Sequence, residues 1–417
     1  MPAPARPMML TFGKKLAATL AIGTVFAAAS LVVLELAIER RARSERPWQV
    51  PPGAPAPTNY IRSSIPGLIY RNSPSPPVPG GRDATRWSNN WGYHDADDFA
   101  VGQPLRGELE IAVVGDSLTA GDRILPPDKL SGIYPALLEQ RLVAQGRRVA
   151  VSNFALNGYN VPQIHAVLKH VVLEYTRPRI VIYAMYENDW NVDVWNDCTP
   201  FSVDLPLEVK ALHPLRPSPE PGLADRLRGA ALTDSALASE VTHRLFDFRY
   251  RVLLPWLSAP HSSAVTAIRD TLAANTLFFR GCRIMLVDER AVVSILDRTI
   301  TDVEQQGARM VILVLPNGGA MLGGWSPVPD ATRLALEWLS PRHPSMLVHD
   351  LTPAYERYRT EGKPLTDLCA ATDDCMHPGL TGQALIADDV LAWLLEQCPD
   401  LGLGSPPQAC PAPEPAR

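Results

Sequence analysis

The sequence predicts an α/β protein with a doubly wound, five-stranded parallel sheet and helices on both faces. Two observations lead to this prediction. Short, almost wholly apolar runs alternate with longer segments in which apolar residues recur at helical spacing. Runs of this apolar kind are typical of parallel strands, because helices cover both faces of such sheets. With 417 residues, of which 46% are hydrophobic, the chain can bury a full core and has room for additional elements.

The predicted strands, in chain order, are Glu110–Val114, Arg148–Phe154, Arg179–Met185, Met310–Leu315 and Met346–Leu351. The helical patterns between and after them are Ile133–Gln145, Val161–Tyr175, Arg290–Gln306, Asp330–Leu339 and Gly382–Glu396. Residues 190–286 form an insertion after the third strand, with helical segments expected near Ser235–Phe246 and Ala264–Asn275. Ligands bind at the carboxyl ends of parallel strands, so an insertion there must overhang the site, and we interpret it as a cap. Trp190 and Trp195 at its start could stack on a substrate or pack within the cap.

The segments outside this core differ from it in composition. An uncharged apolar run, Leu16–Leu34, follows two lysines and is long enough to span a bilayer. It is interpreted as an uncleaved signal anchor within residues 1–38. The alternative is a signal peptide with its apolar core at Leu16–Phe26 and a cleavage site at Ala27-x-Ala29. The rest is divided into a proline-rich spacer at 39–57, a lead-in at 58–107, the main domain at 108–398 and a proline-rich tail at 399–417.

Charge and cysteine content narrow the function classes. The formal net charge is -5 and no basic stripe is present, which argues against nucleic-acid binding. All six cysteines follow the apolar run, and an even number on one side suits an oxidising compartment. We therefore expect residues 40–417 to be extracytoplasmic (periplasmic), attached to the membrane by the N-terminus. The expected disulfides are Cys369–Cys375, Cys398–Cys410 and Cys198–Cys282, and the alternative is six unpaired cysteines in a cytosolic domain.

A candidate nucleophile stands at the end of the first predicted strand. The apolar run Ile111–Val114 ends in Gly115-Asp116-Ser117, and more small residues follow before the next helix. A serine at the carboxyl end of a parallel strand lies where α/β sheets bind ligands, and small neighbours leave its hydroxyl accessible. The alternative is a turn in which the serine only caps a helix.

A serine hydroxyl needs a base and a group that orients the base. Asp374 and His377 lie three positions apart near the end of the main domain, so both could face one site. His377 would take the proton of Ser117, and Asp374 would hold the imidazole in the required tautomer. The alternative is a polar turn before the last helix. The rival pair His349 and Asp350 is excluded, because adjacent strand residues point to opposite faces.

Donors for a developing oxyanion are predicted after the second and third strands. Gly158 follows the second strand and can present its backbone N–H closely, because it has no Cβ. Asn188 follows the third strand and can donate from its side-chain amide. Together with the backbone N–H of Ser117, these groups would provide three donors at one point.

These blocks, in this order, resemble the SGNH hydrolases, also called the GDSL esterase/lipase family, over roughly residues 108–395. The matching blocks are Gly115–Leu118, then Asn153 with Gly158, then Asn188-Asp189, and finally Asp374-x-x-His377. In the third block Tyr186 replaces the usual glycine, which affects the expected shape of the pocket. The lead-in is similar to that of membrane-attached bacterial members, except that His94 stands where an arginine is typical.

The resemblance implies a flavodoxin-like three-layer sandwich and a serine esterase without metal or organic cofactor. Ser117, Asp374 and His377 would be catalytic, and Ser117, Gly158 and Asn188 would form the oxyanion hole. The expected substrate is a small-molecule, lipid or glycan ester, first of all an O-acyl group of an envelope or polysaccharide substrate. Two alternatives stay open: an O-acyltransferase acting on a cell-surface glycan, and a catalytically idle surface protein that binds glycan.

Overall fold

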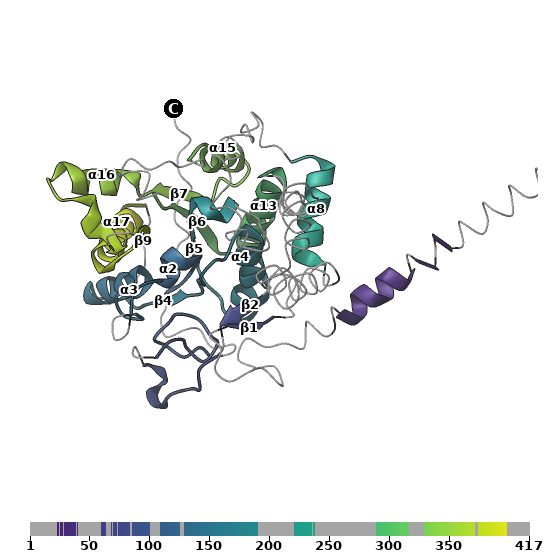
Figure 1. The fold of residues 1–417 in the computed structure, drawn as a ribbon, viewed down its shortest axis with the longest axis horizontal. Helices are drawn as coiled ribbons and strands as arrows, with labels where there is room; N and C mark the ends of the chain where they lie inside the picture. The colour runs from purple at the N-terminus through teal and green to yellow at the C-terminus, as the bar shows by residue number, and fades with distance from the viewer. Residues whose placement is uncertain are drawn as a thin grey trace, which may run out of the picture.

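Five parallel strands form the central sheet of the structure, which is a computed structural model of the chain (Figure 1). In spatial order they are β4 (Val149–Asn153), β3 (Leu109–Gly115), β5 (Ile180–Met185), β6 (Arg309–Val314) and β7 (Leu347–Asp350). The structure describes, with short gaps, residues 23–40, 60–100, 109–190, 221–237, 289–316 and 329–397. Every pairing between these five strands is parallel, which confirms the predicted doubly wound α/β fold.

The strand order places the candidate nucleophile at the point where the winding of the chain reverses. β4 follows β3 in the sequence and lies on one side of it, whereas β5 lies on the other side and β6 and β7 continue outward. Val113 in β3 is thus paired with Asn153 of β4 and with Ile182 of β5. Open α/β sheets bind ligands at the carboxyl edge beside such a switch point. The chain leaves β3 at this point with Asp116 and Ser117.

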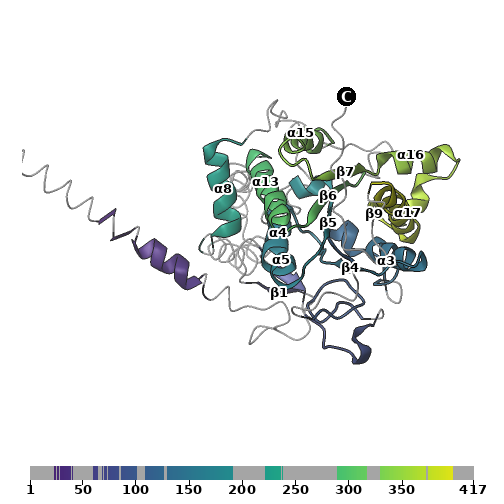
Figure 2. The same ribbon diagram turned by 180° about the vertical axis from the view of Figure 1, so that it is seen from behind.

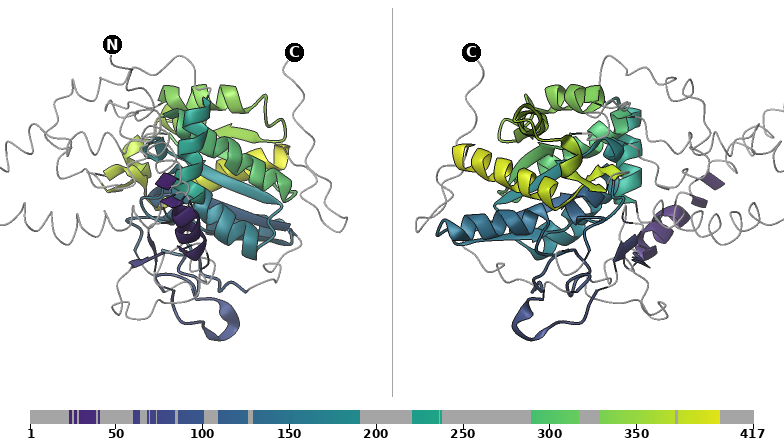
Figure 3. Two further views of the ribbon diagram at one scale, coloured as in Figure 1. Left: turned by 90° about the vertical axis from the view of Figure 1, so that its right-hand side faces the viewer. Right: turned by 60° about the vertical axis from the view of Figure 1, so that its left-hand side comes forward.

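Helices cover both faces of the sheet (Figures 2 and 3). One face packs against α4 (Val161–Val167), its continuation through η2 (Leu168–Val172) and α5 (Leu173–Tyr175), α13 (Glu289–Gln305) and α15 (Pro329–Leu339). The other packs against α3 (Tyr134–Ala144), α16 (Thr352–Thr360) and α17 (Leu380–Gln397). In β3, Val114 joins the first core and Val113 the second, because successive strand residues point to opposite faces.

The predicted strands and helices of the core agree with the structure to within two residues at each end. Several further elements were not predicted, among them the helix α16 and the short hairpin of β8 (Cys369–Ala371) and β9 (Asp374–Pro378). The hairpin strands, of three and five residues, are too short to show a clear alternating apolar pattern.

The described part of the predicted cap is α8 (Leu223–Asp234), which packs against α4 and α13. Asp234 at its end accepts a hydrogen bond from Nζ of Lys169 at 2.7 Å and is also paired with Arg298. These ion pairs bind α8 to the face of the sheet that carries α4 and α13 (Figure 2). The helical segments predicted near 235–246 and 264–275 lie outside the described residues, apart from residues 235 and 237, as do the spacer and the tail.

Residues 29–38 near the N-terminus are helical. Glu35 in this helix accepts hydrogen bonds from Oγ of Ser235 at 2.9 Å and from the backbone N–H of Leu237 at 3.0 Å. Within the described ranges, no helix is both long and apolar enough to cross a membrane. Residues 16–22 of the predicted span lie outside those ranges.

The lead-in segment lies along β4, the edge strand of the sheet. Oδ2 of Asp95 in the lead-in accepts a hydrogen bond from the backbone N–H of Asn153 at 2.9 Å. Oε2 of Glu139, which belongs to α3, accepts one from the backbone N–H of Val151 at 2.8 Å. These carboxylates thus accept hydrogen bonds from backbone N–H groups that an edge strand would otherwise leave exposed. Burial, together with the charges of Asp97 and Glu139, raises the pKa of Asp95 to about 7, although its hydrogen bonds oppose the shift.

Candidate active site

The nucleophile segment begins where β3 ends. Gly115 is required there, because a Cβ would lie only 2.5 Å from Oγ1 of Thr119. Asp116 caps the four-residue helix α2 (Ser117–Ala120), since its Oδ1 accepts a hydrogen bond at 3.0 Å from the backbone N–H two residues later. The serine therefore begins a helix at the carboxyl edge of the sheet.

The hairpin of β8 and β9 carries the other two predicted residues, Asp374 and His377. A disulfide joins Cys369 in β8 to Cys375 in β9, which confirms that predicted pair. Cys198, Cys282, Cys398 and Cys410 lie outside the described residues, so their pairing stays a prediction. Because Cys375 directly follows Asp374, the bridge braces the segment that presents the carboxylate and the imidazole.

Ser117, His377 and Asp374 form a continuous hydrogen-bonded chain. The Ser117 hydroxyl lies 3.0 Å from Nε2 of His377, and Nδ1 of His377 lies 2.9 Å from Oδ2 of Asp374. The backbone N–H of His377 also donates to Oδ1 of Asp374 at 3.1 Å. With the ring proton on Nδ1, Nε2 is able to accept the serine proton. The order of these groups is the one that proton transfer from a serine requires.

The electrostatics of Asp374 suit this arrangement. Partial burial raises the pKa of its carboxyl group, but the hydrogen bonds and charge of His377 and the charge of Arg123 outweigh burial and lower that pKa below its ordinary value. Asp374 is therefore ionised at neutral pH and can stabilise an imidazolium. On the other side of Ser117, Oδ2 of the fully buried Asp116 lies 3.4 Å from the hydroxyl oxygen.

Two charged residues beside this chain were not predicted from the sequence. Oδ2 of Asp122 lies 3.8 Å from Nε2 of His377. Nε of Arg123 donates to Oδ2 of Asp374 at 3.2 Å, and the backbone φ of Arg123 is +69°, which is rare for a residue with a side chain. The only sequence signal is that both residues closely follow Ser117. Their contacts arise when the distant hairpin packs against this loop.

The predicted oxyanion donors lie in the segments that follow β4 and β5. Gly158 is in the turn after β4, with a φ of +73° that favours glycine. That segment runs beside the nucleophile, since the backbone N–H of Leu156 donates to the carbonyl oxygen of Gly115 at 3.3 Å. Asn188 belongs to the short helix η3 (Glu187–Trp190) after β5, and its side chain lies outside the described residues. Donation by Gly158 and Asn188 therefore stays a prediction.

The residues around Asn188 are part of the core. Tyr186, which stands where the family usually has glycine, is buried and packs in the core under α3 and α17. Asp189 is fully buried and accepts a hydrogen bond from the hydroxyl of Tyr183 at 2.9 Å, and burial raises its pKa well above the ordinary value. Trp190 is also buried, and its indole N–H donates to a threonine of α15 at 2.8 Å. The sequence left open whether Trp190 stacks on a substrate or packs within the cap. In the structure it packs against the core of the domain.

The lead-in segment contacts the nucleophile helix through His94. Nδ1 of His94 donates to the carbonyl oxygen of Ala120 at 2.7 Å, while Nε2 accepts a hydrogen bond from Asn72 at 3.0 Å. Burial lowers the pKa of His94 to about 3, so the ring is neutral at neutral pH. Nδ2 of Asn153 donates to the carbonyl oxygens of His94 at 3.0 Å and Thr119 at 3.3 Å. The lead-in thus supports α2 from the side of β4.

The rival pair His349 and Asp350 points apart, as predicted. Nε2 of His349 lies 2.7 Å from Oδ2 of Asp389 in α17, and its ring stacks on Trp393. Oδ1 of Asp350 instead accepts a hydrogen bond from the backbone N–H of Thr352 at 2.8 Å. The two side chains therefore belong to separate interactions.

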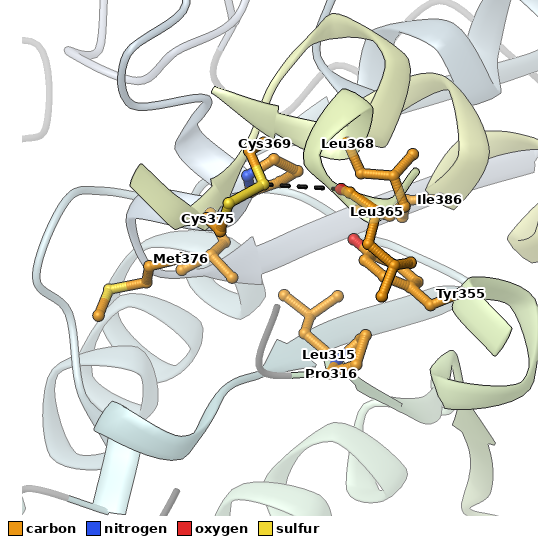
Figure 4. Close-up of a pocket in the computed structure, with 11 residues that line it drawn as sticks. Leu315, Pro316, Tyr355, Leu365, Leu368, Cys369, Cys375, Met376 and Ile386 are labelled. Carbon is orange, nitrogen blue, oxygen red and sulfur yellow. Dashed lines mark hydrogen bonds between the residues drawn. A yellow bond between two sulfur atoms is a disulfide. The ribbon is translucent and has the colours of Figure 1, made fainter. Parts of the chain in front are cut away.

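A small apolar pocket borders the hairpin (Figure 4). It is lined by Leu118, next to the serine, and by Met376 and Pro378 on either side of His377. Figure 4 shows the Cys369–Cys375 disulfide on one side of it. The cavity has a volume of about 20 Å³, room for about one water molecule. Among the residues that the structure describes, no group of His, Cys, Asp or Glu side chains is arranged to hold a metal ion.

Comparison with known proteins found solved structures that are similar to this chain. No protein-family model matches the sequence, and no curated protein matches it. TesA is similar over 69% of this chain and 98% of its own, at 15% identity and a TM-score of 0.35. LAE5, an α/β hydrolase from the metagenome of Lake Arreo, Spain, is similar over 70% and 95%, at 17% identity and a TM-score of 0.37. A variant of Axe2, an acetyl-xylooligosaccharide esterase from Geobacillus Stearmophilus, is similar over 72% and 97%, at 14% identity and a TM-score of 0.38.

Proposed function

We propose that this chain is an SGNH-type serine hydrolase that cleaves ester bonds through an acyl-serine intermediate. The observation that carries the proposal is the hydrogen-bonded chain from Ser117 through His377 to Asp374. Oγ of Ser117 attacks the ester carbonyl carbon while Nε2 of His377 takes the hydroxyl proton. His377 then gives that proton to the leaving alcohol. Water, activated by the same imidazole, attacks the acyl-serine and releases the acid.

The tetrahedral intermediates need donors for their oxyanion. We assign this role to the backbone N–H groups of Ser117 and Gly158 and to the side-chain amide of Asn188. Support comes from their positions after three adjacent strands, β3, β4 and β5. A preorganised donor of this kind typically contributes about 10²–10³ in kcat.

The proposed substrates are O-acyl esters of envelope or polysaccharide molecules. The proposal includes an extracytoplasmic domain attached to the membrane by the N-terminal segment. The Cys369–Cys375 disulfide supports an oxidising compartment. A phosphatase and β-lactamase reporter pair fused after residue 60 tests it: activity of a cytoplasmic reporter alone would exclude this topology.

Hydrolysis of p-nitrophenyl acetate tests the activity. The wild type and a control variant at an exposed position, Glu361→Ala, should release p-nitrophenol and acetate in equal amounts, whereas Ser117→Ala should fall to the background rate. Acetate that appears on an added glycan acceptor instead of in solution would identify the acyltransferase. Full activity in folded Ser117→Ala would exclude the proposed mechanism.

A further inference from the structure

Asp122 lies on the reacting side of the His377 imidazole. Its Oδ2 is 3.8 Å from Nε2, the nitrogen that holds the Ser117 hydroxyl at 3.0 Å. The backbone N–H of Asp122 donates to the carbonyl oxygen of Ser117 at 2.9 Å, which fixes its position relative to the nucleophile. To receive a proton, a leaving oxygen must come within about 3.2 Å of Nε2. A hydroxyl next to that oxygen can therefore reach the Asp122 carboxylate, which lies 3.8 Å from the same nitrogen.

We propose that Asp122 recognises the alcohol portion of the ester by accepting a hydrogen bond from a hydroxyl next to the ester oxygen. The substrate class is then an acylated polyol, such as a sugar with a hydroxyl beside its ester group. This inference rests on the esterase activity proposed above and specifies the substrate of the same site.

The first argument concerns desolvation. The Asp122 side chain is 30% exposed, so water solvates its carboxylate before a substrate binds. A bound alcohol covers that surface. An alkyl alcohol would leave the charge without a partner, which is strongly unfavourable. A hydroxyl group would replace the lost water with a charge-assisted hydrogen bond. Asp122 therefore favours hydroxylated alcohols over alkyl alcohols of the same length.

The second argument excludes a cationic alcohol as the preferred partner. Two positive charges lie near the carboxylates of Asp122 and Asp374. Nε of Arg123 donates to Asp374 at 3.2 Å. Nζ of the buried Lys129 donates to the carbonyl oxygen of Gly121 at 3.3 Å, next to Asp122. Burial lowers the pKa of Lys129 to about 8, while the charge of Asp122 opposes this shift. The positive charges of Arg123 and Lys129 reduce what a substrate cation gains beside Asp122, whereas a hydroxyl donor gains a direct hydrogen bond.

The test compares kcat/KM for acetates that differ only in the alcohol: glycerol monoacetate, propyl acetate, acetylcholine and its uncharged carbon isostere. The wild type should prefer glycerol monoacetate to propyl acetate by about tenfold to a hundredfold, as expected for a hydrogen bond to a charged group. Asp122→Ala should reduce this ratio to nearly one. Asp122→Asn should retain part of it, because the amide oxygen still accepts a hydrogen bond. The exposed control Glu361→Ala should keep the wild-type ratio.

Three results would overturn the inference while leaving the esterase in place. These are equal use of the two neutral acetates by the wild type, a preference that survives Asp122→Ala, and preference for acetylcholine over its uncharged isostere. An equal loss on all substrates in Asp122→Ala would also contradict it, because that pattern indicates an effect on His377 alone. If the wild type hydrolyses no ester above the rate of Ser117→Ala, both the inference and the proposed function fail.

Discussion

The hydroxyl of Ser117 and Nε2 of His377 lie 3.0 Å apart, although 260 positions separate the two residues in the sequence. Gln383 in α17 links the two segments, because its side-chain amide donates to the carbonyl oxygen of Leu118 at 2.9 Å. Its amide oxygen accepts a hydrogen bond from the backbone N–H of Tyr134 at 2.8 Å. The distance between serine and imidazole thus depends on the packing of α17 and its preceding hairpin against α2 and α3.

If these side chains act as one unit, the effects of their substitution should not add. Ser117→Ala and His377→Ala should each lower kcat by about a thousandfold or more, and the double variant should be no worse than either single variant. Asp374→Asn should leave more residual activity, since nucleophile and base are both still present. Circular dichroism should show the same fold in each variant. Additive losses would mean that the two residues act in separate steps.

Arg123 should act through Asp374. The charge of Arg123 helps to lower the pKa of Asp374, so Arg123→Gln should raise that pKa and move the acid limb of the kcat/KM profile to higher pH. The loss at neutral pH should stay below about tenfold, because the arginine side chain is 64% exposed and solvent screens the pair. Arg123→Lys should restore much of the profile. The exposed control Arg333→Gln should leave the acid limb in place. An acid limb that also stays in place in Arg123→Gln would show that the ion pair of Arg123 and Asp374 has no functional effect.

The disulfide in the hairpin should stabilise both the fold and the site. Cys369 and Cys375 are six positions apart, and replacing both by serine should lower the free energy of unfolding by about 2 kcal/mol. Turnover should also fall, since the hairpin carries Asp374 and His377. Urea unfolding and kcat of the double variant measure the two effects. Reduction of the wild type should lower stability and turnover in the same way. Any response of the double variant to reductant reports on the other cysteines. Unchanged kcat in the double variant would show that the bridge does not support the site.

Asp95 should make stability depend on pH. The folded-state pKa of Asp95, about 7, lies above the ordinary value of 3.8. The contribution of its protonated form to the free energy of unfolding is therefore complete below pH 3.8 and is lost as pH rises through about 7. Relative to the wild type, Asp95→Asn should therefore gain stability between pH 4 and pH 7, by up to about 4 kcal/mol. Urea unfolding at several pH values measures this difference, with the exposed Asp367→Asn as control. A difference that does not change with pH would contradict a raised pKa at Asp95.

The parts of the structure that the sequence predicts well are those governed by local patterns. The apolar run before Gly115 and the periodicity of segments such as 161–175 predict buried strands and amphipathic helices, and their alternation predicts that the sheet is parallel. The order of the motifs also indicates Ser117 and His377 as partners, although His377 lies on the antiparallel hairpin of β8 and β9 and not at the end of a parallel strand.

The remaining features depend on tertiary contacts that have no local pattern. Asp122 and Arg123 contact the hairpin only after the domain has folded, and neither side chain differs in sequence from an ordinary exposed loop residue. The buried position of Tyr186 likewise follows from its orientation at the end of β5, which sends its side chain into the core under α3 and α17. The resemblance alone had left the effect of this residue on the pocket open.

Labelling with a fluorophosphonate tests the central claim, that Ser117 is an activated nucleophile, most directly. Mass spectrometry of the intact protein should show a single adduct, and peptide mapping should place it on Ser117. The adduct should be absent from Ser117→Ala and should form far more slowly on His377→Ala, since the hydroxyl then has no base. A folded wild type that forms no adduct, or forms it on a different serine, would contradict the account.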